Sequence, residues 1–140
     1  MNLSKKLQFT SQYNVIGGTE EEHDIEVPVR HIAPNFGNTH LIWKSDKMKF
    51  DAFAEYNNEL SFLDLAPSEA EKDYIYALDS NGNPYSPSWY TLNFSAQMEV
   101  YKNTTVTASL ENITDQRYKT YSSGIAAPGR NLIIAVSYSL

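Results

Sequence analysis

Residues Asn131–Leu140 read NLIIAVSYSL and carry the pattern that decides the fold. From Leu132 onward an apolar or aromatic side chain stands at every second position, which is typical of a β-strand with two unlike faces. The period continues to the last residue, whereas a domain usually finishes in a few loose polar residues. We therefore expect the carboxyl end of the chain to be built into a sheet.

The same two-residue period recurs upstream and predicts five further strands, because each run is bounded by turn residues. The clearest run reads YTLNFSAQMEVY over Tyr90–Tyr101 and alternates without a break. The six predicted strands cover residues 3–15, 39–45, 47–57, 89–101, 104–112 and 130–140. The pattern predicts an all-β fold, an antiparallel up-and-down meander of about six strands that forms the C-terminal segment of a large transmembrane β-barrel.

Long and short connections alternate strictly along these strands, so all short turns fall at one end of the sheet. Large bacterial barrels have short periplasmic turns and long extracellular loops, which predicts a periplasmic carboxyl end. Aromatic residues gather near both ends and predict two interfacial girdles. The expected girdle at the turn end contains Trp43, Tyr101 and Tyr138, and that at the loop end contains Tyr13, Tyr56, Trp89, Tyr90, Tyr118 and Tyr121.

Composition narrows the function classes. The chain has 140 residues, a net charge of -6 and no cysteine. A nucleic-acid-binding protein normally shows a basic face, and the absence of cysteine excludes disulfides, thiolate zinc sites and a cysteine nucleophile. No run approaches the ~20 apolar residues that a transmembrane helix needs. No serine stands in a nucleophile elbow and no phosphate-binding loop occurs, so we expect neither an enzyme, catalytic residues nor a cofactor.

Three segments resemble the last barrel strands of the TonB-dependent outer-membrane receptors. They are Tyr85–Asn93 (YSPSWYTLN), Leu110–Tyr118 (LENITDQRY) and Ser122–Leu132 (SSGIAAPGRNL). The middle segment is similar to the family's Asn-Leu-Phe-Asp-x-x-Tyr pattern, with Ile113 and Thr114 as variants. The resemblance covers roughly residues 34–140. Such barrels commonly end in Phe, whereas this sequence has Leu140.

This resemblance implies a 22-stranded barrel, closed by an N-terminal plug, in the outer membrane of a Gram-negative bacterium. It implies TonB-energised uptake of a scarce ligand: siderophore-iron, haem, cobalamin or a glycan. The implied partners are outer-membrane lipid and lipopolysaccharide, the remaining barrel and plug, and the barrel-assembly machinery through the C-terminal strand, with TonB reached only through the plug. We expect a receptor fragment that is not competent alone, since an open sheet in lipid leaves edge groups that each cost several kcal/mol.

Two residue sets follow from this orientation. The expected lipid-facing residues are Leu92, Phe94, Met98, Val106, Leu110, Leu132, Ile134, Val136 and Tyr138. The expected ligand-facing loop residues are His23, His31, Tyr74, Tyr76, Arg117, Tyr118 and Tyr121. The three histidines are too widely spaced to predict a metal site.

The alternative interpretation is a soluble all-β ligand- or carbohydrate-binding module, such as a sandwich or a small barrel. In such a module the apolar faces of the strands must be buried against each other. In a receptor segment the same faces form one outward band. Burial of Leu92, Phe94, Met98, Ile134 and Val136 in a closed core would contradict the receptor interpretation.

Overall fold

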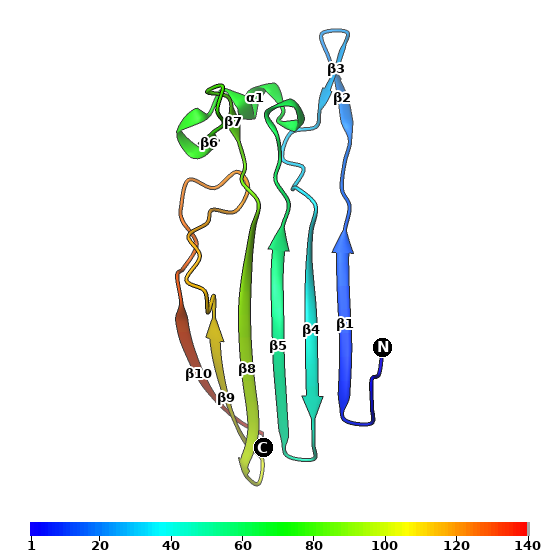
Figure 1. Cartoon of the computed structure of the whole chain (residues 1–140), viewed down its shortest axis with the longest axis vertical. Helices are drawn as coiled ribbons and strands as arrows, with labels where there is room; N and C mark the ends of the chain where they lie inside the picture. Colours follow the sequence, from blue (N-terminus) through cyan, green and yellow to red (C-terminus); the bar gives the residue numbers. More distant parts are fainter. Residues whose placement is uncertain (140) are drawn as a thin grey trace.

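The computed structural model describes residues 1–139 and consists of one sheet with a cap of connections at one end (Figure 1). The sheet has the strand order β1-β4-β5-β8-β9-β10, and every neighbouring pair is antiparallel. Its strands are β1 (Leu7–Asn14), β4 (Phe36–Lys44), β5 (Met48–Asn57), β8 (Trp89–Tyr101), β9 (Thr104–Glu111) and β10 (Asn131–Tyr138). This meander of six strands confirms the predicted fold class.

The strand ends differ from the sequence-based ranges for local reasons. The first strand, expected over 3–15, begins at Leu7 because the Ser4 hydroxyl accepts hydrogen bonds from the amides of Lys6 and Leu7 and bends the chain there. The second, expected over 39–45, begins at Phe36, which pairs with Asn14 of β1. The last ends at Tyr138, and Leu140 lies outside the described residues.

Short turns join β4 to β5 and β8 to β9, while the three long connections gather at the opposite end (Figure 1). The first connection contains the hairpin β2 (Thr19–Glu22) and β3 (Ile25–Pro28). The second contains η1 (Phe62–Asp64), α1 (Pro67–Ala70), η2 (Asp73–Ile75), β6 (Ala77–Leu78) and β7 (Pro84–Tyr85). These elements are two to four residues long, which is too short to create a recognisable hydrophobic period.

The sheet inverts the usual distribution of polar and apolar side chains. On β8, Thr91 and Asn93 are 2% and 5% exposed, whereas the intervening Leu92 and Phe94 are 43% and 41% exposed. Among residues 1–139 the only buried hydrophobic residues are Leu65 and Ala66, and both lie in the second long connection. The apolar face of the sheet is therefore not the wall of a protein core.

No helix among residues 1–139 is long and apolar enough to cross a membrane.

Candidate functional site: an apolar sheet face and a cluster of loops

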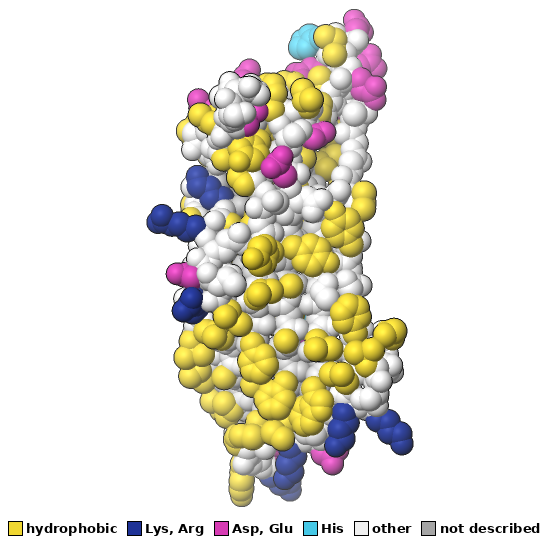
Figure 2. Space-filling model, in the orientation of Figure 1, with side chains coloured by type: hydrophobic (Ala, Val, Ile, Leu, Met, Phe, Trp, Pro, Cys, Tyr) yellow, Lys and Arg dark blue, Asp and Glu magenta, His cyan; other side chains and the backbone are white. Residues whose placement is uncertain are grey.

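The apolar face of the sheet is continuous from strand to strand. Phe94 pairs with Leu110, which pairs with Leu132. Met98 and Val136 both pair with Val106 in the same way, so these side chains share one face. Figure 2 shows hydrophobic side chains gathered over the lower and middle parts of this surface. All nine residues expected to face lipid stand on this face by register; seven are exposed, and Val106 and Leu110 are half-buried.

Aromatic rings link strands on this face, both neighbouring strands and, across Gly37 of β4, the strands β1 and β5. Phe50 stacks on Trp43 and on Phe94, with ring centroids 5.5 and 6.1 Å apart. Tyr56 of β5 stacks on Tyr13 of β1 at 6.3 Å. Such pairs add to sheet stability beyond the backbone ladder. The apolar face therefore holds itself together through cross-strand contacts.

Three hydroxyls on this face lie within hydrogen-bond distance of one another. The Thr39 hydroxyl lies 2.9 Å from the hydroxyl of Ser11 and 3.3 Å from that of Tyr56. The Tyr56 ring also lies over Gly37, where an added Cβ would approach the ring to 2.7 Å. Glycine is required there because the carbonyl oxygen of Gln12 lies even closer to that position, so backbone and ring together occupy the space of a side chain. Hydroxyls that bond one another in this way suit a surface facing away from water.

Charge divides between the two ends of the sheet. Six of the eleven basic residues stand at the short-turn end: Lys5, Lys6, Lys44, Lys47, Lys49 and Lys102. Asp46 and Glu99 accompany them there, and Asp51 lies 3.8 Å from Lys49, whereas most acidic residues lie in the long connections. Figure 2 shows basic side chains directly below the apolar area and acidic ones at the top. The two ends therefore present opposite charge to their surroundings.

One buried carboxylate joins the three long connections. Glu69 of α1 has no exposed surface. It accepts hydrogen bonds from Lys72 Nζ (2.6 Å) and Tyr76 OH (2.8 Å) of its own connection. It also accepts from Arg30 Nε (3.3 Å) of the first and from Ser122 Oγ (3.2 Å) of the third. A buried charge needs such partners, so Glu69 ties segments that are far apart in the sequence.

This network shifts the titration of its members. Burial by itself would raise the pKa of Glu69, but hydrogen bonds from Lys72, Tyr76 and Ser122, with the charge of Lys72, lower that pKa from 4.5 to about 2. Burial, and then the hydrogen bond to Glu69, raise the pKa of the Tyr76 phenol well above its ordinary value. Both shifts keep a carboxylate acceptor opposite a neutral phenol donor.

The last long connection is closed at its base by Asn112, which is 3% exposed. Its Nδ2 donates to the carbonyls of Gln116 (2.9 Å) and Pro128 (3.2 Å), and its Oδ1 accepts from the Gln116 amide (2.9 Å). Three residues later, Asp115 Oδ1 accepts from the Arg130 amide at 2.8 Å. Asn112 has φ 47° and Asp115 φ 55°, conformations that Asn and Asp tolerate. The Asn-x-x-Asp spacing thus binds both ends of the connection together.

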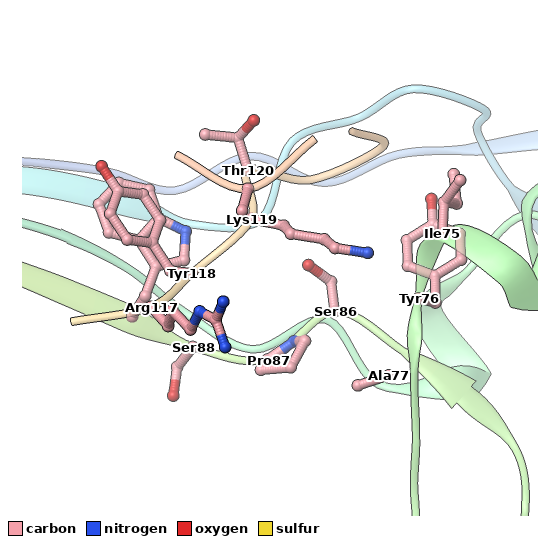
Figure 3. A pocket seen from close by; sticks show the side chains of 12 residues that line it. Ile75, Tyr76, Ala77, Ser86, Pro87, Ser88, Arg117, Tyr118, Lys119 and Thr120 are labelled. Carbon is pink, nitrogen blue, oxygen red and sulfur yellow. The ribbon is translucent and has the colours of Figure 1, made fainter. Parts of the chain in front are cut away.

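A cavity of about 410 Å³ opens between the second and third connections (Figure 3). We call it the Trp89 cavity; its lining residues are Ile75, Tyr76, Ala77, Ser86, Pro87, Ser88, Trp89, Arg117, Tyr118, Lys119, Thr120 and Ala126. Trp89 and Tyr118 stack with centroids 4.2 Å apart and form one wall. Burial raises the pKa of Tyr118, with a further contribution from the carboxylates of Glu55 and Glu111, which are not among the lining residues.

Comparison with known proteins gives a consistent answer about the fold. Neither a family model nor a curated sequence relative matches the chain. Among solved structures, the copper transporter OprC matches 99% of this chain at a TM-score of 0.77 and 12% identity, over 21% of its own length. The siderophore receptor PiuA from Acinetobacter baumannii matches 98% at 0.59 and 18% identity, over 20% of its length. The ferric enterobactin receptor PfeA from Pseudomonas aeruginosa matches 99% of this chain at a TM-score of 0.65 and 12% identity, over 20% of its own length.

These neighbours are TonB-dependent receptors. The chain has the fold of a segment of their barrel. It spans about a fifth of the length of each receptor. In transmembrane barrels of this kind the outward face of the strands is apolar.

The receptor-barrel fold brings some of the expected ligand-facing residues together and separates others. Tyr76, Arg117 and Tyr118 line the Trp89 cavity. The ring centroid of Tyr121 lies 6.2 Å from that of Tyr76, which places Tyr121 beside the cavity. His31 Nδ1 lies 3.7 Å from Glu69 Oε1, which places it in the carboxylate network. His23 sits at the exposed tip of the β2–β3 hairpin, and Tyr74 is 77% exposed. These two do not share the cavity.

The predicted loop-end girdle is partly wrong. Trp89 alternates with Tyr90 and therefore points to the polar face. Tyr118 stacks on it, and Tyr121 packs within the loop cluster. Tyr13, Tyr56 and Tyr90 remain on the apolar face by their register. The position of Trp89 along its strand predicted the correct end of the sheet. The two-residue period, however, places its side chain on the polar face rather than the apolar one.

Several residues of the loop cluster were not predicted from sequence. Trp89 and Ser86 lie within the YSPSWYTLN segment that resembles the receptor family, but that resemblance did not assign them to a site. Glu69 lies in a stretch without periodicity and carries no signal, because its role depends on partners up to 53 residues away. Among residues 1–139, no group of three His, Cys, Asp or Glu side chains is arranged to hold a metal ion.

Proposed function

We propose that this chain forms part of the barrel wall of a Gram-negative outer-membrane receptor. In this proposal the receptor takes up a scarce ligand with energy delivered by TonB. The neighbouring structures are named for copper, siderophore and ferric enterobactin transport, so a metal or metal chelate leads among the ligand classes expected from the resemblance, ahead of haem, cobalamin or a glycan.

The observation that carries the proposal is the inverted sheet. Ile134 and Val136 are 67% and 68% exposed, whereas Asp51 on the opposite face is 9% exposed. A soluble sheet with that distribution would place a large apolar area in water, which monomeric proteins avoid. The soluble binding-module alternative requires a covering layer, and none lies over this face among residues 1–139. A lipid environment suits an exposed apolar face of this kind.

The loop cluster supplies the extracellular mouth in this proposal. Its second and third connections enclose the Trp89 cavity, and Glu69 holds all three connections in one arrangement. Ligand-facing roles are proposed for Tyr76, Arg117, Tyr118 and Tyr121. Arg117 and Arg130 are exposed cations that suit an anionic ligand or lipopolysaccharide phosphates.

The remaining partners follow from the barrel geometry. β1 and β10 are the edges of the sheet and are left to pair with further strands of the same barrel. The C-terminal strand is the proposed contact of the barrel-assembly machinery. TonB would act through a plug, which the polar face of this sheet would surround.

The absence of cysteine allows a direct test, since single cysteines can be introduced without background. Cysteines placed one at a time at positions 92 to 95 of β8 would be labelled in detergent micelles with a water-soluble and with a lipid-soluble reagent. We expect the lipid-soluble reagent to favour 92 and 94 and the water-soluble one to favour 93 and 95. Uniform labelling, or a chain that is a monodisperse soluble monomer without detergent, would contradict the proposal.

The transport role needs its own experiment. In the source bacterium, deletion of the gene carrying this segment should reduce growth when one scarce nutrient limits it. Comparing iron, copper, cobalamin and haem limitation would identify the ligand class. A strain lacking TonB function should show the same defect, and a deletion that affects none of these conditions would contradict the uptake proposal.

A further inference from the structure

We propose that the Trp89 cavity binds a small planar organic anion, of which an aromatic carboxylate is the simplest representative. This inference rests on the proposed function and deepens it, because it names the ligand chemistry of one part of the loop cluster. It is carried by three features of the cavity: an aromatic wall, and, among residues 1–139, a buried donor without a partner and two cations that form no ion pair.

The aromatic wall suits a flat ligand group. Trp89 and Tyr118 stack with an interplanar angle of 28°. Trp89 Nε1 is the only buried side-chain polar atom among residues 1–139 that lacks a hydrogen-bond partner. An indole nitrogen is a donor only, and a buried donor without a partner is unfavourable. An oxygen acceptor that reaches the indole N–H from the cavity would remove that unfavourable state, and an anionic oxygen would do so most strongly.

The cations of the cavity favour a negative ligand. Arg117 and Lys119 form no ion pair with any residue among 1–139, whereas Arg30 and Lys72 both pair with Glu69. Figure 3 shows the ends of the Arg117 and Lys119 side chains turned into the same space as the Ser86 hydroxyl. Among residues 1–139 no Asp or Glu lines the cavity, although the chain has 17 acidic residues. The lining is therefore cationic, and the nearby carboxylates of Glu55 and Glu111 lie outside it, on the side of Tyr118.

The dimensions of the cavity limit the ligand to a small molecule. Its volume of about 410 Å³ lies toward the lower end of the range for small-molecule sites. The rest of the lining is largely apolar, with Ile75, Ala77, Pro87 and Ala126. A one- or two-ring aromatic body would contact this apolar part while its anionic group meets Arg117, Lys119 and the indole N–H.

The two tryptophans make the binding test specific. In ¹⁵N-labelled chain in detergent micelles, each indole N–H gives one resonance, and a Trp43→Phe variant assigns them. We expect 2-naphthoate to shift the Trp89 resonance in a saturable manner and to leave that of Trp43, which stacks on Phe50 on the apolar face, unchanged. Neutral 2-naphthalenemethanol and inorganic phosphate should each bind at least about tenfold more weakly, because the alcohol lacks the negative charge and phosphate lacks the aromatic ring.

Arg117→Gln/Lys119→Gln should weaken naphthoate binding by roughly tenfold or more. The matched control, Lys47→Gln/Lys102→Gln, removes the same charge at the other end of the sheet and should bind naphthoate as the unsubstituted chain does. Equal affinity for naphthoate and the neutral alcohol would overturn the inference, and this comparison needs no variant to fold. If the cysteine pattern of β8 stands while naphthoate fails to bind, only this inference fails; if the cysteine pattern fails, the proposed function fails.

Discussion

The strand region and the loop end of this molecule are ordered by different interactions. In the strand region the backbone ladder satisfies the peptide groups, and apolar side chains such as Phe94 and Ile134 remain exposed on one face. At the loop end, order depends on a few buried polar groups, chiefly Glu69 and Asn112, that bond segments far apart in sequence. The first region is specified by a repeating pattern, and its apolar face is the one proposed to meet lipid. The second is specified by single residues.

The largest expected effect comes from placing a charge on the apolar face. Phe94→Arg should lower the free energy of unfolding in phospholipid bicelles by about 2–4 kcal/mol, because an arginine near the bilayer midplane is strongly unfavourable on a lipid-facing strand. Chemical unfolding followed by Trp43 fluorescence measures it. Thr107→Arg places the same group on the polar face, beside Gln97 and Ala135, and should change stability little. Equal losses would show that both faces meet the same environment.

The corresponding change at the loop end removes the shared carboxylate. Glu69→Ala should destabilise the loop cluster by about 3 kcal/mol, since it removes the acceptor of a buried charged network. Hydrogen exchange should rise together in all three long connections, while the amides of β5 and β8 keep their protection. Glu71→Ala, an exposed neighbour, is the control. Loosening confined to the second connection would show that Glu69 does not join the three.

The same carboxylate predicts a pH dependence confined to the loop end. The pKa of Glu69 is about 2 in the folded protein against an ordinary 4.5. Ionisation therefore favours the folded loops; this contribution is complete above the unfolded pKa and is lost as pH falls through the folded one. At pH 3 about 2 kcal/mol should be lost. Loop hydrogen exchange, corrected for intrinsic rates, should show a transition between pH 4.5 and 2 that Glu69→Gln abolishes. Its persistence in that variant would assign it to another group.

The strand region could largely be predicted from the sequence, whereas the arrangement of the loop end could not. The alternation in Tyr90–Tyr101 was sufficient to predict a strand and the residues on each of its faces, because a strand repeats every two residues. The motif at Leu110–Tyr118 pointed to the receptor fold. The contacts of Glu69 and the stacking of Trp89 on Tyr118 are single contacts between remote segments. They do not recur along the chain, so no periodic pattern in the sequence predicts them. The Trp89 cavity exists only once two connections, remote in sequence, meet.

The base of the last connection tests whether one residue can specify a loop. Asn112→Ala should lower the stability of residues 113–129 by about 2 kcal/mol, through lost hydrogen bonds and a positive φ that alanine disfavours. Asn103→Ala is the matched control: φ is 61° in a short turn, and no side-chain hydrogen bond of Asn103 is present among residues 1–139. It isolates the backbone contribution, which should be about 1 kcal/mol. Hydrogen exchange in each turn measures both, and equal effects would mean that the Asn112 side chain contributes nothing.

The smallest effect concerns the charge difference between the two ends. Lys102 is exposed in the β8–β9 turn, next to the exposed Tyr101 at the margin of the apolar face. A lysine there should interact with anionic phospholipid headgroups, worth about 1 kcal/mol per residue. The gain in unfolding free energy when phosphatidylglycerol replaces part of the phosphatidylcholine in bicelles should therefore fall by about that amount in Lys102→Gln. Lys119→Gln, at the loop end, should leave the gain unchanged, because Lys119 lines the Trp89 cavity rather than the margin of the apolar face. An equal fall in both variants would mean that net charge, rather than its position at the turn end, governs the response to lipid.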